Sequence, residues 1–377
     1  MQYKEYELGE LLPFEQPTAY IVKSTDYNDS YSTPVLTAGK SFILGKTNEK
    51  YGIFDQLPVI IFDDFTTATQ FVNFKFKVKS SAMKILHINT ALVMPKYIFY
   101  RLQIIQFDHS THKRYWIQSY SKIKVSIPSL DEQSRIVSRI DELFSEIDKA
   151  VDRLKATKEQ LAVYRQAVLV DAFRVVTNST HLKIGYVCAK IVDCPHSTPK
   201  WEKNGKLCLR TTNFKRGYLD LQSPNYVSEE TFNDRNRPII PQPGDVLYSR
   251  EGSVLGIACT IPSNVYPCLG QRMMLLRSGE KLNNRYLMHY LNSPMVTNHV
   301  IATKGGTGSP HINVGDIKEF QIPIPSLEEQ SNIVRQIEEQ LSSCDNVEKT
   351  VDAILTQADA MRQSILKQAF EGKKDVY

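Results

Sequence analysis

The sequence of 377 residues lacks the marks of membrane, secreted and zinc-binding proteins. It contains no run of about 18 apolar residues, and its amino terminus, "MQYKEYELGELL", has no signal-peptide core, so we expect a cytoplasmic protein that does not enter a membrane. Its six cysteines begin only at Cys188 and never form a C-x-x-C pair, which indicates free thiols. Hydrophobic residues at 42% and charged residues at 23% are typical of a folded chain of two or three domains.

An internal repeat organises the sequence. "IPSLDEQSRIVSRIDE", which starts at Ile127, returns as "IPSLEEQSNIVRQIEE", which starts at Ile324. After a shift of 197 residues, 128–173 match 325–370 without a gap, with 19 identities in 46 positions. Because a repeat defines architecture before any local assignment, it predicts four segments. They are 1–127, 128–173, 174–324 and 325–377.

Net charge alternates along these four segments. Residues 1–127 carry +4 and residues 174–324 carry +7, whereas 128–173 carry −2 and 325–377 carry −4. A basic excess confined to the two long segments indicates a polyanionic partner there, although a solvated surface could carry the same charge.

The repeated segments have the pattern of long helices. Proline, serine and acidic residues stand at each start, and apolar residues recur every seven positions, as in a coiled coil. A neighbouring stripe is expected to include Leu143, Phe144, Ala150, Val151 and Tyr164 in the first copy, and Leu341, Val347, Ile354, Leu355 and Met361 in the second. Two polar residues, Gln340 and Glu348, interrupt the second pattern. The recurring residues are Ile140, Ile147, Leu154, Leu161 and Val168, and then Ile337, Cys344, Val351, Ala358 and Ile365.

We expect these two helices to pair with each other. About 43 helical residues span about 65 Å, which is too long to be buried in either basic segment. Antiparallel pairing lets the segment 174–324 lie where the first helix ends and the second begins, with 1–127 at the opposite end. In the parallel alternative, 174–324 would have to bridge the full helix length.

The two basic segments resemble each other in the order of their motifs. Each contains short β-branched and aromatic runs bounded by Gly, Pro and Asn, followed by a stretch of helical spacing near Tyr97 or Tyr286. The predicted fold class is therefore α+β. It consists of two pseudo-symmetric, mainly-β domains separated by two long antiparallel coiled-coil helices.

At these residues the chain resembles the specificity subunit of type I restriction–modification systems. The resemblance is carried by "IPIPSLEEQSNIV" and its second copy, and by "PGDVLYSREGSVLG" followed by "LGQRMMLLR". "VLTAGK" and "FDDFTTAT" are also typical of such domains, and the resemblance covers essentially the whole chain. It implies two target-recognition domains that each read half of a split, asymmetric site in double-stranded DNA, with the helices as a spacer.

The resemblance also implies partners. Two methyltransferase (M) subunits would modify adenine N6, and motor-nuclease (R) subunits would join them, so S-adenosylmethionine, ATP and Mg²⁺ are expected on the partners and no cofactor on this chain. The chain itself would be noncatalytic. In agreement, no two prolines are adjacent, so the N-P-P-Y or D-P-P-Y element that holds a flipped adenine is absent.

Three short motifs have a chemical alternative. "TAGKS" at 37–41 ends like a phosphate-binding loop, but Pro34 occupies the position of a required glycine. "DCPHSTP" at 193–199 offers Cys194 as a nucleophile, although a DNA-facing loop is favoured there. "DHSTH" offers His109 and His112 to a metal, but its polar neighbours indicate an exposed turn.

Candidates for DNA contacts lie on polar loops of both basic segments. Arg suits guanine and Asn or Gln suits adenine, while Lys and hydroxyl groups hold phosphates. The alternatives are solvated loop residues, a salt bridge for Arg250 beside Glu251, and a solvated strand face for Lys75, Lys77 and Lys79. The candidates are Thr37, Lys40, Thr66, Thr67, Thr69, Lys79, Ser80, Ser81, His196, Arg210, Asn213, Lys215, Arg216, Ser249, Arg250, Gln271, Arg272, Lys304, Thr307 and His311.

Two other functions are compatible with the sequence. In one, the paired helices are a structural adaptor and the basic segments bind protein. In the other, the chain is a nuclease whose Asp63, Asp64, Asp245 and Glu251 bind Mg²⁺, although such carboxylates more often cap turns. An adaptor would prefer no duplex, and a nuclease would cut DNA without added subunits.

Overall fold

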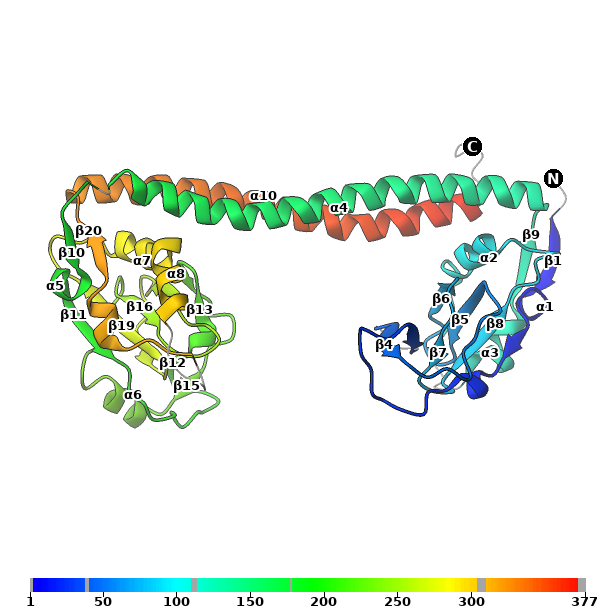
Figure 1. Ribbon diagram of the computed structural model, residues 1–377, viewed down its shortest axis with the longest axis horizontal. Coiled ribbons are helices and arrows are strands. Elements are labelled where there is room, and N and C mark those ends of the chain that lie inside the picture. Colours follow the sequence, from blue (N-terminus) through cyan, green and yellow to red (C-terminus); the bar gives the residue numbers. More distant parts are fainter. Residues whose placement is uncertain (1–2, 38–40, 110–113, 177, 304–309, 372–377) are drawn as a thin grey trace. The chain divides into compact units, whose positions relative to one another are not determined.

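The computed structural model describes residues 3–37, 41–109, 114–176, 178–303 and 310–371. The chain forms two compact units, of which unit 1 comprises Met1–Leu154 with Ala353–Tyr377 and unit 2 comprises Lys155–Asp352. Each unit contains one mainly-β domain and part of each long helix (Figure 1). Within the described ranges, no helix combines the length and the apolar character that a membrane span requires.

The domain of unit 1 contains two sheets. The first is antiparallel with the strand order β2-β8-β5-β6, and the second has the order β4-β3-β7, in which β3 and β7 are parallel. Strands β1 and β9 pair separately, which brings the two ends of the domain together. The elements are β1 (Lys4–Glu7), α1 (Leu8–Leu11), β2 (Phe14–Glu15), the 3-10 helix Pro17–Tyr20, β3 (Thr33–Leu36), β4 (Ile43–Thr47), β5 (Val59–Asp63), β6 (Thr69–Val72), β7 (Lys77–Val78), β8 (Met83–His87), α2 (Pro95–Leu102), α3 (Tyr115–Gln118), the 3-10 helix Tyr120–Lys122 and β9 (Lys124–Ile127).

The domain of unit 2 repeats this topology. Its antiparallel sheet has the order β11-β19-β16-β17, its second sheet has the order β15-β12-β18 with β12 and β18 parallel, and β10 pairs with β20. A hairpin of β13 and β14 is added. The elements are β10 (His181–Lys183), α5 (Ile184–Val187), β11 (Cys188–Asp193), β12 (Lys206–Leu209), the 3-10 helix Thr211–Asn213, β13 (Phe214–Lys215), β14 (Tyr218–Leu219), β15 (Tyr226–Val227), α6 (Glu229–Arg235), β16 (Val246–Ser249), β17 (Ala258–Thr260), β18 (Cys268–Leu269), β19 (Met273–Ser278), α7 (Asn284–Asn292), α8 (Pro294–Thr303), α9 (Val314–Lys318) and β20 (Gln321–Pro323).

The two repeated segments form α4 (Leu130–Arg174) and α10 (Leu327–Phe370). Each helix follows the last strand of a domain, because Pro128 or Pro325 lacks the N–H that a strand ladder needs and the next residue, Ser129 or Ser326, accepts a hydrogen bond from an amide of the first helical turn. The predicted fold class, with two similar mainly-β domains and two long helices, is confirmed.

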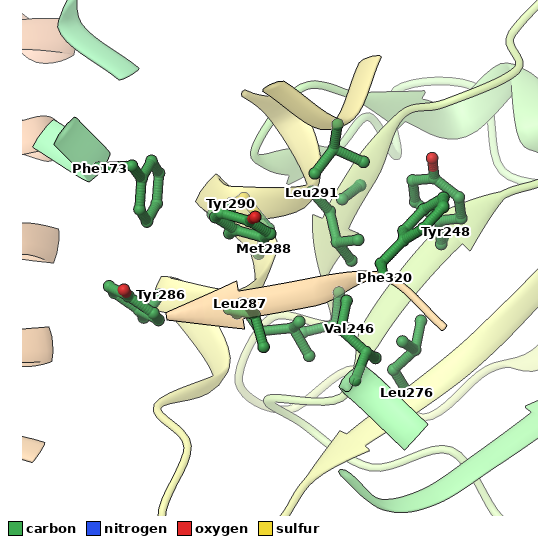
Figure 2. Close-up of a cluster of buried hydrophobic side chains, with 14 of the residues drawn as sticks. Phe173, Val246, Tyr248, Leu276, Tyr286, Leu287, Met288, Tyr290, Leu291 and Phe320 are labelled. Atoms are coloured by element: carbon green, nitrogen blue, oxygen red, sulfur yellow. The ribbon is translucent and has the colours of Figure 1, made fainter. Parts of the chain in front are cut away.

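Each domain packs against the start of one long helix and the end of the other. In unit 2 the end of α4 contributes Phe173, whose ring lies 5.2 Å from that of Tyr286 and 5.1 Å from that of Tyr290 on α7 (Figure 2). The start of α10 adds Ile333 and Ile337 to the same core. Since opposite helix ends meet in one core, the two helices run antiparallel here.

Unit 1 has the equivalent core with the helices exchanged. The end of α10 contributes Phe370, whose ring lies 5.2 Å from that of Tyr97 on α2, together with the buried Leu366. The start of α4 adds Ile136 and Ile140. Phe173 and Phe370 are matching positions of the sequence repeat, so the repeat encodes the same contact twice.

Ion pairs along the helices confirm the antiparallel direction within unit 2. Arg165 of α4 pairs with Asp345 (2.7 Å) and Glu348 (2.9 Å), and Lys158 pairs with Asp352 (2.7 Å). The residue numbers of these partners decrease along α4 as they increase along α10, as antiparallel helices require. Glu348, which interrupts the apolar pattern, therefore serves an interhelical ion pair.

The seven-residue pattern predicted the buried seam better than its neighbouring stripe. Seven seam residues are buried, namely Ile140, Ile147, Val168, Ile337, Cys344, Val351 and Ala358, and Leu154, Leu161 and Ile365 are half-buried. Of the ten stripe residues, Leu143, Phe144, Val151, Leu341 and Leu355 are half-buried. The stripe prediction was wrong for the other five, because a two-helix pairing buries only a narrow seam on each helix. The exposed residues are Ala150, Tyr164, Val347, Ile354 and Met361.

A buried glutamine accounts for the "EQ" that both copies of the repeat share. Gln133, in the first turn of α4, is completely buried. Its side-chain oxygen accepts a hydrogen bond from the amide of Met94 (2.7 Å), and its side-chain nitrogen donates to the carbonyls of Leu92 (3.2 Å) and Pro128 (3.0 Å). One side chain therefore ties the helix start to the segment that leads into α2.

Gln330 makes the same three bonds in unit 2. It accepts from the amide of Asn283 (2.8 Å) and donates to the carbonyls of Lys281 (2.9 Å) and Pro325 (3.0 Å). It is also completely buried. We call these two side chains the glutamine clamps.

Candidate nucleic-acid interface

Parallel strand pairing brings the predicted contact loops of unit 2 together. β12 and β18 pair in parallel and end at Leu209 and Leu269, so Arg210 and the segment 270–272 emerge at the same edge of the sheet. The amide of Gly270 donates to the carbonyl of Leu209 (2.9 Å). A Cβ at position 270 would stand 2.2 Å from that oxygen, so this approach requires glycine.

The two loops line a cavity of about 190 Å³, which we call the arginine recess. None of its six described lining residues is acidic. Small-molecule sites usually measure about 300–1,000 Å³, so the recess suits the edge of a base or a phosphate better than a cofactor. The lining residues are Thr198, Trp201, Arg210, Thr211, Gln271 and Arg272, three of which are predicted DNA contacts.

Arg210 is held over an aromatic ring. Its guanidinium carbon lies 5.2 Å from the ring centre of Trp201, a cation–π contact. Its backbone amide donates to the side-chain oxygen of Asn213 (2.9 Å). Because Asn213 is buried and spends its amide group on this bond and on the carbonyl of Asp220 (3.0 Å), it positions Arg210 and does not itself read a base.

Arg235, at the end of α6, joins the loop after β18 to the loop 194–199, which follows β11 and supplies Thr198 to the recess. It is 5% exposed and donates to the carbonyls of Leu269 (2.6 Å) and Gly270 (2.8 Å) in one loop. In the other loop it donates to the carbonyls of Pro195 (3.2 Å) and Ser197 (3.2 Å). A buried cation satisfied by four carbonyls fixes both loops at once.

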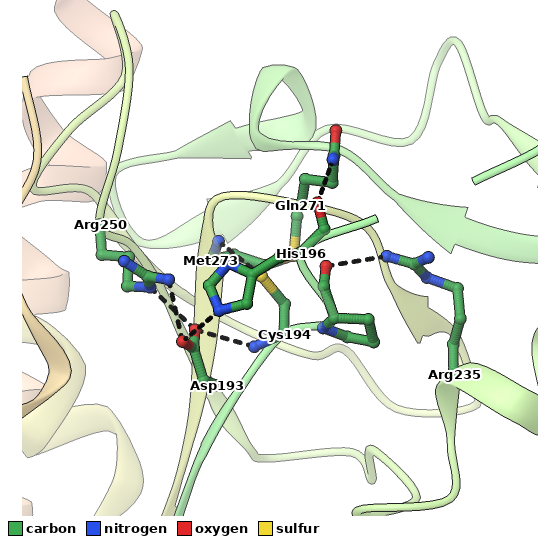
Figure 3. A network of polar contacts seen from close by, with 8 residues as sticks. Asp193, Cys194, His196, Arg235, Arg250, Gln271 and Met273 are labelled. Carbon is green, nitrogen blue, oxygen red and sulfur yellow. Dashed lines mark hydrogen bonds and ion pairs between the residues drawn. The ribbon is translucent and has the colours of Figure 1, made fainter. Parts of the chain in front are cut away.

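Gln271 links the same loops at the surface. Its side-chain nitrogen donates to the carbonyl of His196 (2.6 Å) (Figure 3). Its side-chain oxygen accepts from the hydroxyl of Thr198 (3.3 Å). The next residue, Arg272, has φ +66°, a left-handed conformation that is costly for a residue with a side chain. Its Nε lies 3.6 Å from Glu251.

Arg250 is a structural residue, which corrects its prediction as a DNA contact. Its guanidinium binds both oxygens of Asp193, at 2.8 and 2.9 Å, and its side chain is 9% exposed (Figure 3). The salt-bridge alternative therefore holds, but with Asp193 as the partner in place of Glu251. Ser249 is also corrected, because it is completely buried and donates to the carbonyl of Val254.

Cys194 has the environment of a core thiol. It is buried, burial raises the pKa of its thiol, and its sulfur accepts from the amide of Met273 (3.4 Å). His196 is exposed, with Nε2 3.3 Å from Asp193, whose oxygens already hold Arg250. A buried thiol with a raised pKa does not act as a nucleophile. The segment 193–199 is therefore an ordered loop on which His196 is exposed. All six cysteines are free thiols, as predicted.

The remaining candidates of unit 2 lie away from the recess lining. Lys215 and Arg216 are exposed in the β13–β14 hairpin, where Arg216 donates to the carbonyl of Asn292 (3.2 Å) at the end of α7. His311 forms an isolated bridge with Glu251. Lys304 and Thr307 lie outside the described residues.

Unit 1 brings its candidates together by the same strand pairing. β3 and β7 are parallel and end at Leu36 and Val78, and the amide of Lys79 donates to the carbonyl of Leu36 (2.9 Å). Thr37 and Lys79 therefore occupy the positions that Arg210 and Gly270 occupy in unit 2. Ser80 and Ser81 follow, and Lys40 lies outside the described residues.

A second candidate loop of unit 1 connects β5 and β6. Thr67 has φ +58°, again left-handed, and its hydroxyl lies 2.9 Å from Nε2 of His109. Asp63 accepts from the amide of Thr66 (3.2 Å) and caps this turn. Thr69 accepts from the side chain of Gln103 (2.5 Å). The exposed His109 thus supports this turn, while its predicted companion His112 lies outside the described residues.

The carboxylates proposed for Mg²⁺ have protein partners. Asp64 lies 3.3 Å from the buried Lys84, and Asp245 binds Arg277 through both oxygens, at 2.8 and 2.7 Å. Over the described part of the chain, no group of three potential metal-ligating side chains comes together. Lys77 is corrected as well: it is buried and donates to the carbonyl of Tyr51 (2.6 Å), so it is neither solvated nor free for phosphate.

Two residues of the interface were not found from the sequence. Trp201 is one of only two tryptophans and follows "HSTPK", which was a weak signal. Arg235 lies in "NDRNR", where nothing distinguishes it from a surface arginine. Arg235 matters because it bonds to carbonyls more than 30 positions away in the sequence. Trp201 matters because its ring lies against the guanidinium of Arg210.

The family model for the type I restriction modification DNA specificity domain matches residues 2–156 and 189–357. The specificity subunit of the type I restriction enzyme EcoR124I/EcoR124II from Escherichia coli is 34% identical over 339 residues, which cover 87% of this chain and 84% of that protein. The MjaVIII specificity subunit from Methanocaldococcus jannaschii is 22% identical over 373 residues, covering 92% and 86%.

Two solved structures share the fold. One, from work on complex assembly and conformational transition of the type I R-M system, has a TM-score of 0.68 at 18% identity and covers 98% of this chain and 97% of its own. The other is the HsdS subunit from Thermoanaerobacter tengcongensis, with a TM-score of 0.54 at 19% identity and the same coverage.

Proposed function

Since this chain belongs to the family of type I restriction–modification specificity subunits, we propose that its two units read the two halves of an interrupted, asymmetric site in double-stranded DNA. Specificity subunits are the noncatalytic DNA-recognition components of such systems.

One observation carries the division into two half-sites. The loops after β3 and β7 in unit 1 and after β12 and β18 in unit 2 have the same backbone arrangement. Their side chains differ, with Thr37, Lys79 and Ser80 in one unit and Arg210, Gln271 and Arg272 in the other. A shared frame with different donors and acceptors reads two different base sequences.

The long helices offer surfaces for the M subunits. In unit 1, Ile354 and Met361 on α10 are 42% and 54% exposed, and in unit 2, Val163 and Tyr164 on α4 are 71% and 51% exposed. Apolar side chains left uncovered by the helix pair indicate protein contacts. We propose one M subunit at each of these two surfaces, with R subunits joining them.

The cofactors of the complex belong to its catalytic subunits. S-adenosylmethionine, ATP and Mg²⁺ bind to the partner subunits, and this chain contributes DNA recognition alone. The complex acts in the cytoplasm, where its DNA substrate is. The continuous helices α4 and α10 set the length of the unread spacer.

Coexpression with the methyltransferase subunit encoded beside this chain tests the proposal. The host DNA is sequenced for N6-methyladenine, and we expect one interrupted motif with two unlike halves. Equal methylation of all sequences, or binding of the purified complex without preference for any duplex, favours the adaptor alternative. Cleavage of DNA by this chain with Mg²⁺ alone favours the nuclease.

A further inference from the structure

We infer that the arginine recess reads guanine, so that the half-site recognised by unit 2 contains a G·C pair contacted by Arg210 and Arg272. This inference rests on the proposed function and specifies the base chemistry of one of its two readers.

The arginine recess is positively charged. Arg210 and Arg272 line it together with two threonines, a tryptophan and a glutamine, and no acidic side chain is among these described residues. The recess therefore presents hydrogen-bond donors and positive charge. Guanine presents two acceptors, O6 and N7, in the major groove, whereas adenine presents one acceptor and one donor.

Gln271 has a structural role in the recess. An adenine contact requires the free amide of Asn or Gln. The nitrogen of the Gln271 amide donates one hydrogen to the carbonyl of His196 (2.6 Å) and its oxygen accepts from the hydroxyl of Thr198 (3.3 Å), so the amide plane is fixed by protein partners. Gln271 thus builds the wall of the recess, and the guanidinium groups are left as its reading groups.

Neighbouring residues preorganise the side chain of Arg210. The ring of Trp201 at 5.2 Å and the bond from its own amide to Asn213 fix the plane and the origin of the side chain. A planar guanidinium held in one orientation forms two parallel hydrogen bonds at low entropic cost. A phosphate contact does not need such orientation, because charge alone suffices for it.

The backbone at Arg272 has an unusual conformation that the surrounding structure enforces. Its left-handed φ of +66° is maintained by neighbouring strands, since its carbonyl accepts from the amide of Arg250 (3.0 Å). Arg250 is itself locked to Asp193. Strain of this kind persists where the surroundings enforce it, and here it directs an exposed arginine, steadied by Glu251 at 3.6 Å, toward the recess.

Unit 1 supplies the contrast. Arginine is absent from residues 1–100, and the matching loops carry Thr37, Lys79 and Ser80. The equivalent loops of unit 1 therefore have no arginine, and changes at Lys79 or Ser80 serve as matched controls there.

The test compares methylation motifs and duplex binding for Arg210→Ala and Arg272→Ala, with Lys79→Ala and Ser80→Ala as controls. We expect each arginine variant to accept other bases at one guanine position of one half-site, with discrimination there reduced about 10- to 100-fold. The other half-site stays unchanged. Both side chains are exposed, so the variants retain the fold, which circular dichroism verifies.

Three results decide the inference. If the alanine variants weaken binding equally on all sequences and reduce its salt dependence, these arginines hold phosphates and the guanine inference is wrong. Relaxation at an A·T position also refutes it. After either of these two results, a methylation motif that the wild-type complex still produces supports the proposed function. A wild-type complex that produces no motif refutes both the proposed function and the inference.

Discussion

Replacing Gln330 by leucine should destabilise unit 2 by about 2–4 kcal/mol. The change keeps the approximate size of a completely buried side chain but removes its three hydrogen bonds, to Asn283, Lys281 and Pro325. It leaves one buried amide and two carbonyls without this partner, and an unsatisfied buried group costs about 1–3 kcal/mol. Better burial of the leucine offsets a part of that cost.

The two tryptophans make the measurement specific to each unit. Trp116 lies in unit 1 and Trp201 in unit 2, so a Trp116→Phe background reports urea unfolding of unit 2 and a Trp201→Phe background reports unit 1. Gln330→Leu should lower the free energy of unfolding seen by Trp201 more than that seen by Trp116. Gln133→Leu should show the reverse preference, because its clamp lies in unit 1.

Gln340→Leu is the matched control. This glutamine lies on the same helix but is exposed, so its replacement should change the free energy of unfolding by no more than about 0.5 kcal/mol. A loss below about 0.5 kcal/mol for Gln330→Leu, or an equal loss for Gln340→Leu, would show that the clamp does not stabilise the helix start.

Three further predictions concern unit 2. Arg235→Met should remove the four hydrogen bonds that join the segments 193–197 and 269–272. Amide hydrogen exchange in both segments should therefore accelerate. Unchanged exchange would mean that Arg235 does not hold these loops. Hydrogen bonding to His289 lowers the pKa of Glu338, so this carboxylate stabilises the fold above its ordinary pKa near 4.5 and the gain is lost below it. Glu338→Gln should therefore flatten the pH dependence of unfolding between about pH 5 and pH 3, and an unaltered slope would contradict this. Burial raises the pKa of Cys188 to about 12, so iodoacetamide at pH 8 should modify it at least about 100-fold more slowly than free cysteine, as peptide mass spectrometry will report.

The local pattern of the sequence predicted much of the architecture. The repeat, the seven-residue spacing and the short strand-like runs are properties of neighbouring residues, so they could be read without coordinates. The same pattern overestimated the apolar stripe, because spacing alone does not say how wide a surface the partner helix covers. Tyr164, Ile354 and Met361 are exposed for that reason.

The candidate interface could be predicted only as a set of loops. Sequence analysis placed Arg210, Gln271 and Arg272 among many candidates, but their meeting depends on the parallel pairing of β12 with β18. It also favoured Arg250, whose carboxylate partner stands 57 positions away. Partner choice over such separations depends on strand order, which no local pattern contains.

By itself, the sequence determined the duplication, the two long helices, the two similar domains and the family. These features depend on periodicity and on motifs that each occupy one continuous stretch. Only the tertiary structure decided that Gln133 and Gln330 clamp the helix starts, that Arg235 joins two loops, and that Trp201 lies under Arg210. The physical reason is that a hydrogen bond or a ring contact requires two groups within a few ångströms, and the fold alone brings together groups that the chain keeps far apart.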